Sequence, residues 1–287
     1  MRTARVTAVA PAEPESCIGR NRELWDHWTG FHVGSDHYDV KGFLDGRSSL
    51  EFFEEAELGD VSGRSLIHLQ CHFGLDTLSW ARRGARVTGV DFSPEAIVEA
   101  GQMARLADLD AEFRCAEVYG LPAELDGRFD IVYVSFGSVV WLPDIARWAR
   151  AAARLLAPGG ILYVAEYHPV VHTLDFDDAT REPVVCYPYF DRAQPITHEL
   201  RGTYTDSADD VTESGYTWAH SLGAIVTSVL DAGLRLDFLH EFGSVWFPVL
   251  PYLERGEDGR YRLPRRVEGE LPLLFSLRAT LPEAPPS

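Results

Sequence analysis

LIHLQCHFGLDTLSWARRGARVTGVDFS, residues Leu66 to Ser93, is the stretch that decides the fold of this 287-residue chain. Its apolar run up to Leu69 predicts a strand, and a tight turn containing Gly74 leads from that strand into a helix. A second apolar strand follows and ends at Asp91. This order makes up half of a nucleotide-binding α/β fold, in which ligands bind at the carboxyl ends of the strands. The turn and Asp91 are therefore expected side by side at one ligand site.

The same alternation of strands and helices extends outward from this stretch. It indicates a mostly parallel sheet covered by helices on both faces. The predicted strands are Arg64–Leu69, Arg86–Val90, Ala111–Ala116, Phe129–Ser135 and Ile161–Glu166, and the predicted helices are Asp76–Arg83, Pro94–Leu109 and Asp144–Leu156. After an interruption, a helix over Ser221–Ala232 and strands over Leu236–Glu241 and Leu273–Ala279 complete the sheet, the last strand running antiparallel.

Other segments flank or interrupt this core. Residues 19–58 are expected to form a helical cap, with helices near 21–32 and over Ser49–Glu57. Aromatic and β-branched runs split by turn residues predict an inserted antiparallel β element over 167–216. The predicted organisation is thus a disordered tail (1–18), the cap (19–58), the core (59–166), the insertion (167–216), the C-terminal part of the core (217–280) and a second tail (281–287).

Composition and charge narrow the class of protein. The formal net charge of −18 argues against binding to nucleic acid, which needs a basic face, and against binding to anionic membranes. No apolar run is long enough for a transmembrane helix, and the N-terminus lacks the apolar core of a signal peptide. The scattered cysteines (Cys17, Cys71, Cys115, Cys186) form no CxxC pair. A reduced, cytoplasmic location without a metal site is therefore expected.

The turn after the first core strand indicates which nucleotide could bind. The dinucleotide fingerprint GxGxxG is absent, since QCHFG, residues 70–74, contains only Gly74. Bulky groups in this turn suit a ligand without a pyrophosphate to cradle. The turn therefore points away from NAD and toward S-adenosylmethionine, with Asp91 accepting hydrogen bonds from the ribose hydroxyls.

Several motifs between about residues 60 and 166 resemble those of class I S-adenosylmethionine-dependent methyltransferases. The matching stretches are LIHLQCHFGLDTL, GVDFS, AEVYGLP, FDIVYVSFGSVVWLPD and LLAPGGILYVAE. With the N-terminal NRELWDHWTGFHVGSDHYD, the chain is similar to actinobacterial natural-product methyltransferases that have an HLQCHFGLDT first motif. Some proteins of that kind methylate an indole ring carbon.

The first motif departs from the superfamily pattern of an acid followed by GxGxG. His68 stands at the position of the acid, and Gln70 and His72 stand at two glycine positions. A carboxylate that usually helps to hold the methionine ammonium is therefore missing. The amide oxygen of Gln70 is a candidate substitute.

The resemblance implies a set of cofactor-binding residues. These are Tyr38, Leu69, Gln70, Cys71, His72, Gly74, Asp91, Phe92, Ser93, Glu117, Val118 and Ser135. Some of them have a structural alternative: Asp91 could be a helix-capping or surface acid, Glu117 an ordinary loop acid, and QCHFG a structural turn packed by Phe73.

Substrate and catalytic candidates flank the same site. The candidates for substrate binding are Trp25, Trp28, His32, Trp141, Tyr167 and Trp218. The first three, at helical spacing, and Trp141 could instead be core packing. The candidates for catalysis are Glu166, His168 and His220. A carboxylate and an imidazole at a strand end can accept a proton from a nucleophile, although Glu166 could instead be a buried acid satisfied by backbone donors.

These observations favour a methyltransferase for a small aromatic, tryptophan-derived substrate such as a diketopiperazine, acting on an indole carbon. An O- or N-methyltransferase of another metabolite is the first alternative. A second is a non-catalytic binding protein that retains the fold, which the altered first motif would allow. The chain could also form a homodimer through the insertion.

Overall fold

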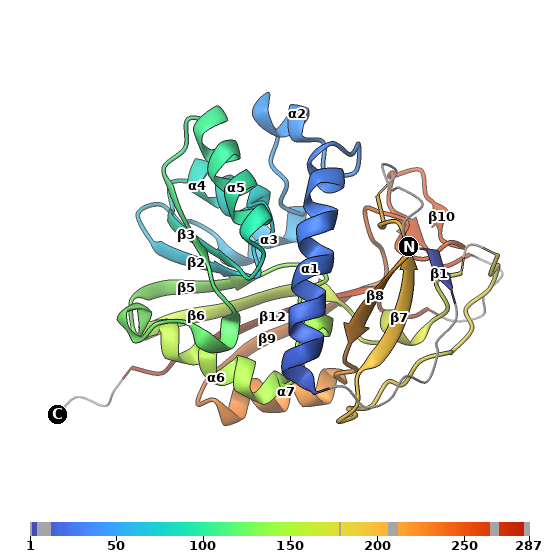
Figure 1. Cartoon of the computed structure of the whole chain (residues 1–287). Helices are drawn as coiled ribbons and strands as arrows, with labels where there is room; N and C mark the ends of the chain where they lie inside the picture. The colour runs from blue at the N-terminus through green and yellow to red at the C-terminus, as the bar shows by residue number, and fades with distance from the viewer. Residues whose placement is uncertain (1, 5–12, 178, 206–211, 265–269, 284–287) are drawn as a thin grey trace.

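The computed structural model describes residues 2–4, 13–177, 179–205, 212–264 and 270–283 (Figure 1). Its centre is a seven-stranded sheet in the order β4-β3-β2-β5-β6-β12-β9. The strands are β2 (Ser65–Leu69), β3 (Arg86–Asp91), β4 (Ala111–Cys115), β5 (Phe129–Val134), β6 (Leu156–Tyr167), β9 (Arg235–Phe242) and β12 (Leu274–Thr280). Strands β2 to β6 pair in parallel, whereas β12 is antiparallel to both its neighbours. The prediction of a mostly parallel sheet with an antiparallel last strand is confirmed.

Helices cover both faces of this sheet because its strands are apolar on both sides. Neighbouring residues of β2 point to opposite faces, so Ile67 joins the core under α6 and α7, and Leu66 joins the core under α3 and α4. These helices, together with α5, are α3 (Phe52–Leu58), α4 (Leu75–Arg82), α5 (Pro94–Leu106), α6 (Ile145–Leu155) and α7 (Leu222–Asp231).

The strand order reverses between β2 and β5. From β2 the chain proceeds outward to β3 and β4, whereas β5 starts on the other side of β2 and leads to β6. Such a reversal leaves a crevice outside the carboxyl ends of the two central strands. The sheet therefore places its ligand site where β2 and β5 end.

The N-terminal cap and the insertion pack against one another beside this crevice (Figure 1). Helix α1 (Pro14–Val33) lies between the core and a second sheet of order β1-β7-β8, made of Arg2–Ala4, Ile196–Arg201 and Thr212–Thr217. The Asn21 side chain donates to the Tyr216 carbonyl at 2.8 Å and accepts from its N–H at 2.9 Å. The predicted antiparallel insertion is therefore present, and its edge strand β8 is hydrogen-bonded to α1 of the cap.

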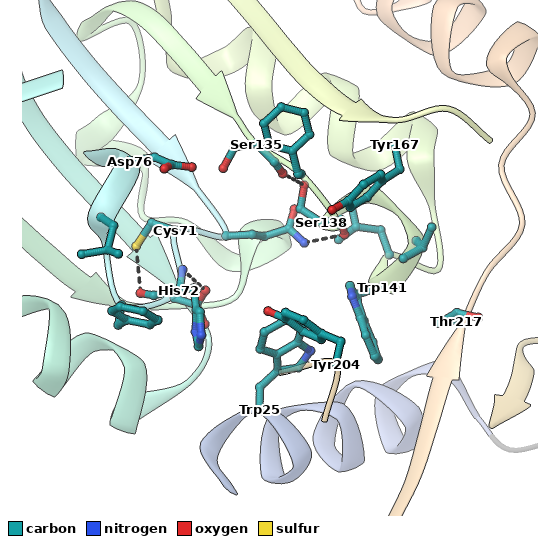
Figure 2. Close-up of a pocket in the computed structure, with 18 of the residues that line it drawn as sticks. Trp25, Cys71, His72, Asp76, Ser135, Ser138, Trp141, Tyr167, Tyr204 and Thr217 are labelled. Atoms are coloured by element: carbon teal, nitrogen blue, oxygen red, sulfur yellow. Dashed lines mark hydrogen bonds between the residues drawn. The ribbon is translucent and has the colours of Figure 1, made fainter. Parts of the chain in front are cut away.

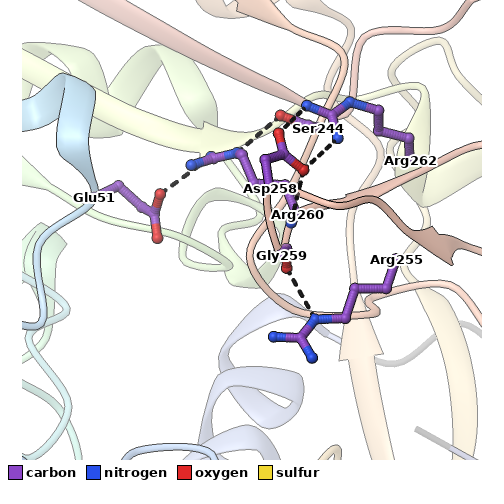
Figure 3. Close-up of polar contacts among 7 residues, drawn as sticks. All are labelled: Glu51, Ser244, Arg255, Asp258, Gly259, Arg260 and Arg262. Carbon is purple, nitrogen blue, oxygen red and sulfur yellow. Dashed lines mark hydrogen bonds and ion pairs between the residues drawn. The ribbon is translucent and has the colours of Figure 1, made fainter.

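A short hairpin, β10 (Glu254–Arg255) and β11 (Tyr261–Arg262), interrupts the connection between β9 and β12. Figure 3 shows how its turn reaches the cap: the Arg260 guanidinium lies 3.1 Å from the Glu51 carboxylate and donates to Ser244 Oγ at 2.9 Å. Glu51 in turn caps α3. The connection between β9 and β12 is therefore tied to the N-terminal cap.

Some predicted boundaries are wrong. Helix α1 already begins at Pro14, because proline suits the first turn of a helix, and residues 2–4 form β1, so the predicted tail is shorter. Residues 1 and 5–12 of that tail, and 284–287 of the C-terminal one, lie outside the described residues. Strand β6 starts at Leu156 rather than Ile161, because Leu156 pairs with Phe129 across a register irregularity.

None of the helices in the described ranges has the length and apolarity needed to cross a membrane.

Candidate functional site

A cavity of about 570 Å³ lies at the carboxyl ends of β2, β3 and β5, where the core meets α1 and the inserted sheet (Figure 2). The predicted site residues that line it are Trp25, Tyr38, Gln70, Cys71, His72, Gly74, Asp91, Phe92, Glu117, Val118, Ser135, Trp141, Tyr167 and Trp218. Those that do not line it are Trp28, His32, Leu69, Ser93, Glu166, His168 and His220. One cavity thus brings together most of the residues predicted for cofactor and substrate.

The turn after β2 keeps the backbone shape of a glycine-rich turn without its glycines. Gln70, His72 and Gly74 have φ values of 58°, 51° and 81°, all in the left-handed region. Side chains rarely adopt this conformation, whereas glycine adopts it freely. A Cβ on Gly74 would also lie 2.7 Å from the Phe113 ring, so this position needs glycine for space as well. The bulky residues at 70 and 72 therefore add side chains to an otherwise conventional turn.

The side chain of Gln70 presents an unused acceptor. Its Nε2 donates to the Ser138 carbonyl at 2.9 Å, which links the ends of β2 and β5. Its Oε1 is buried and has no hydrogen-bond partner among the described residues. Since a buried amide oxygen is costly to leave unpaired, this atom is suited to receive a donor from a ligand in the cavity.

Asp91 is held in place by the backbone around it. Its carboxylate accepts from the N–H groups of His72 at 2.8 Å and Ser93 at 2.9 Å. Burial raises the pKa of Asp91 to about 6, although the backbone N–H groups act in the opposite direction. The group is thus ionised near neutral pH and keeps lone pairs for a ligand hydroxyl.

His68 occupies the position of the usual acid but does not reach the cavity. Its ring bonds Thr77 Oγ1 at 2.8 Å and Ser135 Oγ at 3.0 Å, and burial lowers its pKa to about 3. A carboxylate enters the cavity from another position, because Asp76 lines it beside Ser135 (Figure 2) and accepts from Ser49 Oγ at 2.6 Å. Asp76 therefore restores an acid to the site from the first turn of α4.

Aromatic rings form the opposite wall of the cavity. Trp25 of α1 meets Trp141 edge to face, with ring centroids 5.4 Å apart. The Tyr38 and Tyr204 hydroxyls hydrogen-bond to each other, and Tyr167 stacks with Trp246. Rings fixed in this way offer flat apolar surfaces to a flat ligand.

The cap residues that do not line the cavity support those that do. His32 is fully buried and bonds His72 Nε2 through Nδ1 at 2.8 Å and Thr203 Oγ1 through Nε2 at 3.1 Å. Trp28 packs behind Trp25 at a ring distance of 5.5 Å. Both therefore act through neighbours, as packing residues rather than as walls of the cavity.

Two of the residues predicted to contact the cofactor, Leu69 and Ser93, also lie behind the wall of the cavity. Leu69 is fully buried in the core under α6 and α7. Ser93 caps α5 by accepting from Ala96 N at 3.0 Å and donates to Asp26 Oδ1 at 2.6 Å. The side chain of Leu69 therefore packs in the core and that of Ser93 caps a helix, and neither lines the cavity.

Glu166, expected as a catalytic base, is used to shape the loop after β5. Its carboxylate accepts from the backbone N–H groups of Gly137, Ser138 at 2.8 Å and Val139 at 3.0 Å. The side chain is 1% exposed and does not line the large cavity. This geometry favours the alternative of a buried acid satisfied by backbone donors.

The two histidines expected in catalysis are likewise engaged elsewhere. His168 lies 3.0 Å from the Glu241 carboxylate, and His220 Nε2 donates to the Leu142 carbonyl at 2.7 Å. Other histidines line the cavity instead, among them His172 and His198. Sequence reasoning missed these two because they come from separate parts of the insertion, and no local pattern sets them apart.

Among the residues that the structure describes, no group of three or more His, Cys, Asp or Glu side chains is arranged to hold a metal ion.

Comparison with known proteins finds a match for the part of the chain that supplies the strand ends of this site. Residues 67–160 match a family model described as a methyltransferase domain. They include the turn, Asp91 and the ends of β4 and β5.

Curated relatives match about a third of the chain. A ubiquinone biosynthesis O-methyltransferase from Xanthomonas oryzae pv. oryzae is 35% identical over 106 residues, covering 37% of this chain and 44% of the relative. One of the same description from Alkalilimnicola ehrlichii is 36% identical over 103 residues, covering 36% of this chain and 41% of that protein. The chain thus matches less than half the length of these relatives.

Solved structures share the fold over more of the chain. An S-adenosylmethionine-dependent methyltransferase from Mesorhizobium loti superposes with a TM-score of 0.55 at 19% identity, covering 83% of this chain and 99% of the other. The [4+2]-cyclase SpnF gives a TM-score of 0.54 at 17% identity over 97% and 99% of the chains. Residues 67–160 therefore match a methyltransferase domain, and the chain has a fold shared with solved structures described as S-adenosylmethionine-dependent methyltransferases. Because one structure with this fold is described as a [4+2]-cyclase, the fold does not identify the reaction, which must be argued from the site.

Proposed function

We propose that this protein transfers a methyl group from S-adenosylmethionine to a small aromatic acceptor. The observation that carries the proposal is the composition of one cavity. The turn of residues 70–74 and Asp91 form one wall, and the aromatic rings of Trp25, Trp141 and Tyr167 form the other. A polar nucleoside with an amino-acid tail fits the first wall, and a flat acceptor fits the second.

The residues at the first wall fit the cofactor in their chemistry. Asp91 would accept hydrogen bonds from the ribose hydroxyls. The unpaired Gln70 Oε1 and the Asp76 carboxylate would receive the methionine ammonium, and Glu117 and Val118 would flank the adenine. When bound, S-adenosylmethionine would supply a methyl group on a positively charged sulfonium: the electron pair of the acceptor would bond to the methyl carbon as the carbon–sulfur bond breaks, with S-adenosylhomocysteine as the leaving group.

The protein's own contribution is to hold the acceptor and exclude water. Proximity and alignment contribute roughly 7–11 kcal/mol in well-oriented systems, so fixed walls matter more than a covalent intermediate. The edge-to-face contact of Trp25 with Trp141 fixes one wall, and the bond between Tyr38 and Tyr204 fixes the adjoining one. These aromatic side chains also remove water from the reacting groups.

An indole ring carbon is the acceptor that we favour. The support is the resemblance of the first motif and of the cap, together with the tryptophan and tyrosine rings around the cavity. An O- or N-methyltransferase of another small metabolite is the second candidate. It is favoured by the curated relatives, which are described as O-methyltransferases.

Calorimetric titration with S-adenosylhomocysteine, and separately with NAD, tests which cofactor the protein binds. We expect micromolar binding of S-adenosylhomocysteine, no binding of NAD, and loss of binding in Asp91→Ala. The matched control is Asp110→Ala, which removes an exposed acid just before β4. Failure of S-adenosylhomocysteine to bind the unaltered protein would overturn the proposal and favour a binding protein that retains only the fold.

Mass spectrometry then tests the acceptor. Indoles, phenols and aromatic amines are incubated with S-adenosylmethionine and the protein, and the products are searched for one added methyl group. Methylation at a ring carbon supports the indole proposal. Methylation at oxygen or nitrogen alone would favour the second candidate.

A further inference from the structure

The end of the cavity beside the inserted sheet has a chemistry different from the rest. Four polar side chains line it: His172, which follows β6, His198 of β7, and Thr217 and Trp218 at the end of β8. Figure 2 shows Thr217 on the opposite side of the cavity from Cys71 and His72. This end therefore lies away from the turn and next to the aromatic wall.

Three buried nitrogen atoms at this end are unpaired. His172 Nε2, His198 Nδ1 and Trp218 Nε1 have no hydrogen-bond partner among the described residues. Trp218 is 1% exposed and His198 is 8% exposed, so neither side chain is satisfied by bulk water. Leaving a buried polar atom unpaired costs about 1–3 kcal/mol, and three together in one cavity call for a ligand.

The fold holds these side chains firmly. His198 Nε2 bonds Thr217 Oγ1 across the β7–β8 pair at 2.7 Å, which fixes the ring and leaves Nδ1 free. The backbone N–H of Trp218 donates to the Val140 carbonyl at 2.8 Å. The unpaired atoms are therefore presented by rigid neighbours, as a binding site requires.

Among the described residues that line this end of the cavity, none carries a charge near neutral pH. Burial lowers the pKa values of His172 and His198 to about 4, so both rings are neutral near neutral pH. The charged residues that line the cavity all belong to the cap and the core: Asp39, Arg47, Glu51, Asp76, Asp91 and Glu117. Neutral imidazoles can donate or accept a hydrogen bond, and the indole N–H of Trp218 can only donate.

We propose that His172, His198 and Trp218 form a subsite for an uncharged hydrogen-bonding group of the acceptor, and that this subsite selects neutral aromatic acceptors over aromatic acids and amines. The inference deepens the proposed methyl transfer and rests on it. A carboxamide matches the set, because its oxygen can accept from Trp218 and its N–H groups can donate to an imidazole. A carboxylate or an ammonium would have to lose its hydration here without an opposite charge.

Binding of matched probes tests the subsite. Indole-3-acetamide, indole-3-acetate and tryptamine share a ring and differ in the charge of the tail, and the corresponding naphthyl amide, acid and amine repeat the comparison. Calorimetry near neutral pH is carried out with and without saturating S-adenosylhomocysteine. We expect the amides to bind at least about tenfold more tightly than the acids and amines.

Variants assign the preference to these side chains. His198→Phe and His172→Phe should each weaken amide binding by about tenfold and leave the acids unchanged. His198→Gln and His172→Gln restore an uncharged hydrogen-bonding group and should recover part of the preference. The control is His240→Phe on β9, whose exposed side chain pairs with Glu57 outside the cavity. Melting temperatures verify that each variant is folded.

The outcomes separate this inference from the proposed function. If S-adenosylhomocysteine does not bind, the proposed function fails. If it binds but the amides bind no better than the acids, or no amide binds, the subsite is wrong while the proposed function stands. A preference for amides that survives both phenylalanine variants would also overturn it.

Discussion

The backbone N–H of His72 donates to the Asp91 carboxylate over 2.8 Å. This bond joins the turn after β2 to the end of β3, two segments that both line the cavity. Because His72 has a left-handed backbone, its N–H points at the acid while its side chain meets the cap. The turn and Asp91 thus form one preorganised unit.

Acidification should weaken cofactor binding through Asp91. Its pKa in the free protein is raised to about 6, so the carboxylate is protonated as the pH falls through that value. A protonated acid accepts ribose hydroxyls poorly, and S-adenosylhomocysteine affinity should fall below about pH 6. His68 and His72 have pKa values lowered to about 3 and do not titrate in this range. Calorimetry across this pH range measures the effect. Asp91→Asn should bind weakly, and the pH dependence that it keeps should come from Asp76, whose pKa burial also raises. If the affinity of the wild-type protein for S-adenosylhomocysteine stayed unchanged down to about pH 5, the assignment of this effect to Asp91 would be wrong.

Loss of the unpaired amide oxygen should weaken ligands that carry an amino-acid tail. In Gln70→Leu the acceptor for an ammonium is removed, and S-adenosylhomocysteine should bind about ten- to a hundredfold less tightly. Methylthioadenosine, which lacks the tail, should bind the variant as it binds the wild type. Titration of both ligands separates the two roles. Equal loss for both would mean that the substitution has disturbed the turn rather than removed a contact.

A carboxylate at position 76 should contribute to the same end of the ligand. Asp76→Asn keeps the Ser49 hydrogen bond and removes the negative charge, so it should also weaken S-adenosylhomocysteine selectively, by about tenfold. If both side chains contact the same ammonium group, the double variant with Gln70→Leu should lose less binding free energy for S-adenosylhomocysteine than the two single variants lose together. If the two losses of binding free energy were strictly additive, the two side chains would contact different parts of the ligand.

Substitution of Glu166 should reduce stability before it reduces activity. Glu166→Gln places an amide nitrogen against backbone N–H groups that now donate to a carboxylate, and the free energy of unfolding should fall by about 2–3 kcal/mol. Denaturant unfolding measures this loss, with Glu241→Gln on the exposed side of β9 as the matched control. A variant of unchanged stability but much lower turnover would instead support the role of a base.

Removal of Arg260 should loosen the attachment of the hairpin to the cap. Its ion pair with Glu51 is less than one-fifth exposed on either side, so Arg260→Ala should lower the free energy of unfolding by about 1 kcal/mol. A double-mutant cycle with Glu51→Gln isolates the pair. Arg255→Ala, on the exposed strand of the same hairpin, is the comparison and should have no more than a small effect.

The core of the fold follows from local patterns in the sequence. Apolar runs ending at Leu69 and Val134, and the serine–proline cap before α5, act over a few residues and predict elements that the structure contains. Asp91 was predictable for the same reason, since it directly follows a buried strand.

Contacts between distant segments could not be predicted in this way. Asp76 takes the place of an acid that the motif lacks, and nothing in its local sequence separates it from an ordinary acid in a first helical turn. His172 and His198 meet through the packing of the insertion, and Glu166 finds its backbone donors only when the loop after β5 folds over it. Such roles depend on tertiary geometry, which periodicity does not report.

The bond between His32 and Thr203 joins residues 171 positions apart. At a synthesis rate of about 5–20 residues per second, α1 leaves the ribosome roughly 10 to 30 s before Thr203 is made. During that delay Leu24 and Trp28, which are buried against Leu200 in the finished protein, lack that part of their cover. The nascent chain therefore carries α1 with apolar side chains that are fully covered only after the inserted sheet is made, and slower translation should increase its dependence on chaperones.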